Sequence, residues 1–92
     1  MTKEDEEYRL QNYTEVLVMQ TLKEMLEKTD GICKCRQCQL EIASYALNQL
    51  QPMYITSHKG EIYSRLEEFK IQVKADIITN LVKAIEIVKK NP

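Results

Sequence analysis

The chain has very few residues that interrupt helices. Its 92 residues include two glycines, two prolines, one phenylalanine, one histidine and no tryptophan. Scarce glycine and proline argue against a loop-rich fold, and no alternating strand pattern persists along the chain. With one histidine and no evident general base beside a nucleophile, the sequence offers no positive case for an enzyme. We therefore expect a non-enzymatic, all-α protein.

Strong charge and long apolar runs are also missing. The net charge is −1, so neither nucleic acid nor an anionic membrane would attract the chain as a whole. No apolar run is long enough to span a bilayer, and residues 2–7 are acidic where a secretory signal would be basic and then apolar. We expect one cytoplasmic domain over residues 1–92, with a frayed segment at 1–11, and neither direct nucleic-acid binding nor membrane insertion.

Helical periodicity predicts two helices in the first half of the chain. Asn12 followed by Glu15 has the form of a capping box, and apolar residues at three- and four-residue steps predict a helix over residues 12–29. Asp30-Gly31 ends it, since glycine accepts the left-handed conformation. A second helix is expected over residues 37–50. Pro52 stops it and begins an extended connector at residues 53–56.

The second half, residues 57–90, admits two interpretations because neither glycine nor proline interrupts residues 61–91. Ser57 is a candidate cap for a third helix, and Asp76 for a fourth after a break near residues 72–76. We predict this break, which gives a compact bundle of about four helices. The competing interpretation is one long helix over residues 58–90, which could not fold back on itself and would force dimerisation.

All three cysteines of the chain, Cys33, Cys35 and Cys38, lie within six residues. The spacing C-x-C-x-x-C favours a metal, because zinc is held by thiolates in a tetrahedral shell and a turn entering a helix can direct three sulfurs to one point. A redox pair and three cysteines without a role are the alternatives. The helical context argues against the redox pair, because the thioredoxin motif follows a strand. We predict structural zinc in a turn between the first two helices.

Three sulfurs leave zinc one ligand short. Glu41 follows Cys38 by three residues, so both fall on one face of the second helix and Glu41 can complete the shell. A first-turn glutamate can equally satisfy free backbone N–H groups. His58 is the other candidate, and water is the third. We assign the metal to Cys33, Cys35, Cys38 and Glu41.

Two segments together resemble the ComFB family, small bacterial proteins named after a late-competence operon. One is the cysteine motif with the acidic residue three positions later. The other is L-N-x-L-x-P-x-Y, present here as Leu47-Asn48 to Tyr54. The resemblance covers about residues 16–90. It implies an all-α, zinc-bound homodimer and a receptor for cyclic dinucleotides such as cyclic di-AMP or cyclic di-GMP, linked to competence or motility regulation. Many members carry two prolines where this chain has Gln51-Pro52.

A cyclic dinucleotide needs cations or helix N-termini for its phosphates, and aromatic or arginine planes for its purines. We therefore predict ligand contacts from Asn48, Tyr54, His58, Lys59 and Arg65. The alternative is a structural module that binds a protein, as yet unidentified, and no small molecule. Apolar stripes on every expected helix exceed what a monomer of this size needs to bury, so the residues also predict a homodimer.

Overall fold

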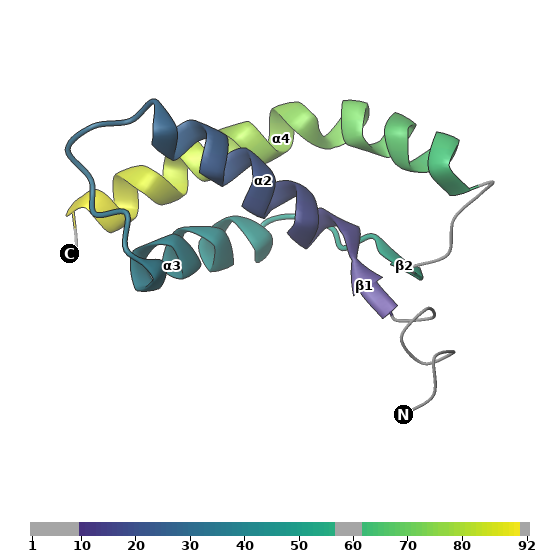
Figure 1. The fold of residues 1–92 in the computed structure, drawn as a ribbon, viewed down its shortest axis with the longest axis horizontal. Helices are drawn as coiled ribbons and strands as arrows, with labels where there is room; N and C mark the ends of the chain where they lie inside the picture. Colours follow the sequence, from purple (N-terminus) through teal and green to yellow (C-terminus); the bar gives the residue numbers. More distant parts are fainter. Residues whose placement is uncertain (1–9, 57–61, 91–92) are drawn as a thin grey trace.

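The computed structural model describes residues 10–56 and 62–90, and in them it contains three helices and two short strands (Figure 1). Their order is β1 (Leu10–Asn12), α2 (Tyr13–Glu27), α3 (Arg36–Leu47), β2 (Tyr54–Thr56) and α4 (Ile62–Lys90). The strands pair antiparallel, with Leu10 opposite Thr56 and Asn12 opposite Tyr54. The fold is therefore mostly helical, as predicted, but the all-α prediction missed this two-stranded ribbon.

Helix α2 begins where the sequence predicted. Asn12 is its N-cap, and the Asn12 Oδ1 accepts a hydrogen bond from the Thr14 N–H at 3.1 Å. The same oxygen accepts the Met53 N–H at 3.1 Å, while the Tyr13 N–H donates to the Met53 carbonyl at 2.6 Å. Buried Thr14 adds a third link, from its hydroxyl to the Gln51 carbonyl at 2.8 Å. We call these three links between residues 12–14 and 51–53 the clasp.

Helix α4 is unbroken over 29 residues, so the prediction of a break near residues 72–76 and of four helices is wrong. The described part of the competing interpretation, one continuous helix, is observed over residues 62–90, and the dimer that it implied stays a prediction. Asp76 does not cap a helix, because it lies in the helix interior, where its carbonyl accepts a bond from the Asn80 side chain at 2.9 Å. At 1.5 Å per residue such a helix is roughly 43 Å long, which matches the 44 Å longest dimension of the molecule. A turn near residue 76 is unnecessary because α2 and α3 fold back onto α4 instead.

The core lies where α2 and α3 pack against the C-terminal half of α4 (Figure 1). Each of the three helices is amphipathic, and each contributes apolar side chains at three- and four-residue steps to the core. They are Leu17, Val18, Leu22 and Leu26 from α2, Ile42, Ala43 and Ala46 from α3, and Ile77, Leu81, Ala84 and Ile85 from α4. The N-terminal half of α4 has a sparser contact with the rest, in which Phe69 meets Tyr13 at 6.3 Å between ring centroids.

None of the helices in the described ranges, 10–56 and 62–90, has both the length and the apolar character needed to cross a membrane.

Candidate metal centre

The cysteines lie in the loop between α2 and α3 and in the first turn of α3. Gly31 has a φ of 76°, the left-handed conformation that glycine adopts without strain, and it turns the chain toward α3. The Gln39 side chain then donates to the Lys34 carbonyl at 2.7 Å, which ties the loop to the helix that follows. The loop is thus folded by local bonds in the described structure.

Cys35 is the N-cap of α3, and its sulfur accepts the Cys38 N–H at 3.4 Å. The three sulfurs all lie within 4.8 Å of one another. A tetrahedral zinc with Zn–S bonds of about 2.3 Å separates its sulfurs by about 3.8 Å. Small side-chain rotations would close that difference, so the residues present fit a thiolate-bound metal.

The cluster shifts the acidity of its own thiols. The pKa of Cys35 is lowered, chiefly because the Cys38 backbone N–H donates to its sulfur and further because the Cys33 and Cys38 thiols do the same. The pKa of Cys38 is raised to about 12, first through the hydrogen bond between its thiol and Cys33 and then through that with Cys35. The Cys35 thiol therefore loses its proton more readily than the Cys38 thiol.

Glu41, the predicted fourth ligand, is not part of this cluster. In the described part of the chain the group of candidate metal donors comprises the three sulfurs alone. Glu41 is exposed on α3, where its Oε1 accepts a hydrogen bond from the Gln37 side chain at 3.4 Å. His58 lies outside the described residues. The assignment of Glu41 to the metal stays a prediction.

The predicted ligand residues lie away from the cysteines. Asn48 is the exposed C-cap of α3, Tyr54 is 61% exposed on β2, and Arg65 is exposed in the early part of α4. Figure 1 places β2 and the start of α4 at the end of the molecule opposite the cysteine loop. Lys59, like His58, lies outside the described residues. Metal site and predicted ligand site are therefore separate features of the fold.

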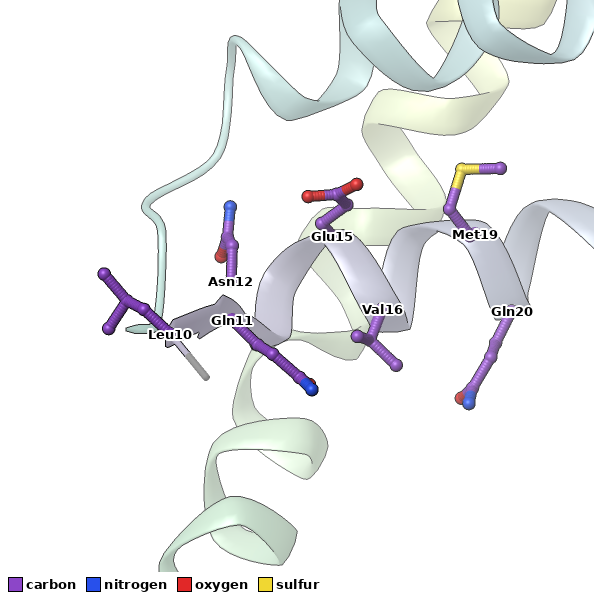
Figure 2. Close-up of a pocket in the computed structure, with 7 residues that line it drawn as sticks. All are labelled: Leu10, Gln11, Asn12, Glu15, Val16, Met19 and Gln20. Carbon is purple, nitrogen blue, oxygen red and sulfur yellow. The ribbon is translucent and has the colours of Figure 1, made fainter. Parts of the chain in front are cut away.

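Sequence reasoning missed an open hollow of about 540 Å³ beside β1 and the start of α2. Figure 2 shows that its lining side chains diverge: Asn12, Glu15 and Met19 project to one side of the helix, and Gln11, Val16 and Gln20 to the other. The Asn12 oxygen is already bonded to two backbone N–H groups. The described residues that line the hollow therefore do not supply the convergent polar groups of a binding site.

The fold and the cysteine cluster define a class: small, mostly helical proteins with a candidate metal centre between two helices. The sequence profile described as "Late competence development protein ComFB" matches residues 11–92, and the chain belongs to this family. The resemblance seen in the sequence is thereby confirmed.

Two comparisons with proteins of Bacillus subtilis extend this assignment. A protein of strain 168 described as "Competence protein ComFB" is 24% identical over 83 residues, which span 90% of this chain and 85% of that protein. The solved structure of the late competence protein ComFB from Bacillus subtilis superposes with a TM-score of 0.71 at 19% identity. That match covers 91% of this chain and 92% of the other, so the two chains share a fold over nearly their whole lengths.

Proposed function

We propose that this competence-associated protein is a non-enzymatic, zinc-stabilised helical module that acts as a signal receptor in the cytoplasm. The cluster of three sulfurs within 4.8 Å carries the proposal. Bound zinc would cross-link the loop after α2 to the start of α3, as structural zinc sites do. In this proposal the metal stabilises the fold at this point of the chain.

Metal content measured by mass spectrometry, together with thiol titration, tests this step. We expect about one zinc per chain and three thiols that become reactive only after chelation or unfolding. Cys38→Ser should lose the metal, whereas Ser44→Ala, a change on the exposed face of the same helix, should keep it. Metal-free protein with three freely reactive thiols would contradict the proposal and would favour the redox interpretation instead.

The signal that we propose is a cyclic dinucleotide. An exposed aromatic ring at Tyr54 and an exposed guanidinium at Arg65 are groups that stack on purines or pair with phosphates. Asn48, exposed at the end of α3, adds a polar group next to the connector that leads to Tyr54. Family membership supports the proposal through the resemblance described above.

Calorimetric titration with cyclic di-AMP and with cyclic di-GMP distinguishes this receptor from a module that binds only proteins. Tyr54→Ala and Arg65→Ala should weaken binding, and Leu40→Ala on α3 should not. Absence of heat with both nucleotides well above micromolar concentration would reject the receptor and leave the protein-binding module.

We further propose that the module is a homodimer joined through α4. Ile71, Ile78 and Val82 are exposed on one face of α4, with Ala75 between them, and Ile71 is 74% exposed. At 100° per residue the stripe of Ile71, Ala75, Ile78 and Val82, here called the α4 stripe, lies well around the helix from the core residues Ile77, Leu81 and Ala84, and the core residue Ile85 lies at its edge. Its intervals of four, three and four residues read the same in both directions. An antiparallel second copy would therefore place Ile71 opposite Val82, as a two-fold interface requires.

A further inference from the structure

A cavity of about 150 Å³ adjoins the cysteine cluster, between the loop and the last turns of α4. It is lined by Gly31, Ile32, Cys33 and Cys38 on one side and by Val88 and Lys89 on the other. Two of the three cysteines thus line a space that exceeds the share of one water, about 30 Å³. The space is large enough for a small donor group with a few attached atoms.

The number of protein ligands available to the metal bears on what this cavity can hold. Closed zinc sites use four protein ligands, whereas open sites use three and leave one position for an exogenous ligand. Here the donor group among the described residues ends at three sulfurs, and Glu41 is hydrogen-bonded to Gln37 on α3. Among the described residues that line the cavity, those other than the cysteines offer no carboxylate, imidazole or further thiol.

Charge identifies the kind of ligand that suits this position. Three thiolates on a divalent ion leave one net negative charge at the centre, which by itself would repel an anion. The lining of the cavity, however, also includes Lys89, and Lys34 and Arg36 flank Cys35 in the sequence. An anionic donor in the cavity would pair with the Lys89 ammonium while bonding to the metal.

We propose that the metal centre is coordinatively open, in place of the predicted coordination by Glu41, and that its fourth position binds a small exogenous thiolate in this cavity, paired with Lys89. The inference rests on the proposed zinc site. Binding is a ligand exchange: the thiolate sulfur forms a bond to the metal, a water leaves, and the thiol proton passes to solvent. Zinc favours sulfur donors, which selects a thiolate over a carboxylate.

Cobalt(II) substitution makes this exchange visible, because the visible bands of tetrahedral cobalt respond to each ligand. Titration of the cobalt-loaded protein with 2-mercaptoethanol, and separately with azide, should shift those bands to saturation. Lys89→Met should weaken the apparent affinity about tenfold, the effect of one lost charge-assisted bond, and Lys89→Arg should restore it. Val88→Phe, which fills the cavity, should block the shift.

Glu41→Gln and His58→Ala are the matched controls, and neither should alter the bands before or after titration. If neither probe shifts the cobalt bands, the proposed open site is wrong. It is also wrong if either control variant changes the spectrum before a probe is added. A protein that takes up no cobalt or zinc at all would overturn the proposed metal function together with this inference. The two failures are therefore distinguishable.

Discussion

Asn12 connects two distant parts of the chain through a single oxygen. Its Oδ1 accepts the Thr14 N–H, which caps α2, and the Met53 N–H, which holds the connector beside β1. Asparagine and aspartate supply this acceptor equally well, whereas alanine supplies none. One side chain therefore stabilises a helix end and a tertiary contact at once.

Two substitutions of Asn12 test whether its acceptor oxygen is the group that stabilises the fold. Asn12→Ala should lower the free energy of unfolding by about 2 kcal/mol, because a cap and a second bond to backbone are both lost. Asn12→Asp keeps the oxygen and should cost much less. Urea unfolding followed by circular dichroism measures both variants, and equal stability of Asn12→Ala and wild type would refute the double role.

The acidity of the cysteines predicts how metal affinity depends on pH. Metal binds thiolates, and the raised pKa of Cys38, about 12, means that its thiol still holds a proton at neutral pH. The lowered pKa of Cys35 means that its proton leaves more readily. Zinc must displace the retained protons, so affinity should rise with pH, by about tenfold per unit for each displaced proton.

Competition with a chromophoric chelator between about pH 6 and about pH 8 measures this slope. Affinity that stays constant over that interval would show that all three sulfurs are thiolates before the metal arrives.

Local residue patterns predicted local features of the site. The C-x-C-x-x-C spacing was sufficient to predict that three sulfurs meet, and Asn12 was identified as a cap from its own neighbourhood. Thr14 could not be identified in this way. Its partner is a carbonyl 37 residues away, and nothing in the segment around Thr14 encodes that distance.

At the scale of elements, α4 shows what periodicity leaves undecided. Strong helix-forming residues permit one helix or two, and a capping residue such as Asp76 predicts a break only if the chain must turn there. Whether the chain turns at Asp76 depends on where α2 and α3 pack, which is a property of the whole fold. The ribbon of β1 and β2 was missed for a related reason, since three residues are too few to show an alternating pattern.

Two substitutions test whether α4 is continuous in solution. Asp76→Ala should change stability by less than about 0.5 kcal/mol, because no cap is lost and alanine favours helix. Ala75→Pro should cost about 3 kcal/mol or more, because proline removes a backbone bond within the helix. Thermal unfolding compares them. A tolerated proline and a harmful alanine would instead indicate a helix boundary at this point.

At the scale of the molecule, α4 has two apolar faces and the described chain covers only one of them. The C-terminal half packs into the core, while the α4 stripe of Ile71, Ala75, Ile78 and Val82 remains exposed. Uncovered apolar area of this kind is typical of an interface between proteins.

Charge placed on the α4 stripe should separate the proposed dimer. Ile71→Glu with Ile78→Glu should give a monomer by light scattering at tens of micromolar, because four carboxylates would meet in a two-fold interface. Gln72→Glu with Thr79→Glu adds the same charge to the same helix outside the stripe and should leave the dimer intact. A wild-type protein that is monomeric at this concentration would contradict the proposal.

We predict that the clasp acts as a hinge for the α2–α3 pair. Its bonds join the start of α2 to the segment after α3 at one end of the pair, and the cysteine loop joins the helices at the other. If withdrawal of metal releases the cysteine loop, we expect the clasp to keep its end of the pair joined. The helix ends next to the cysteine loop would then move more freely. Hydrogen exchange should then accelerate in residues 31–38, while the amides of Tyr13 and Met53 remain slow to exchange.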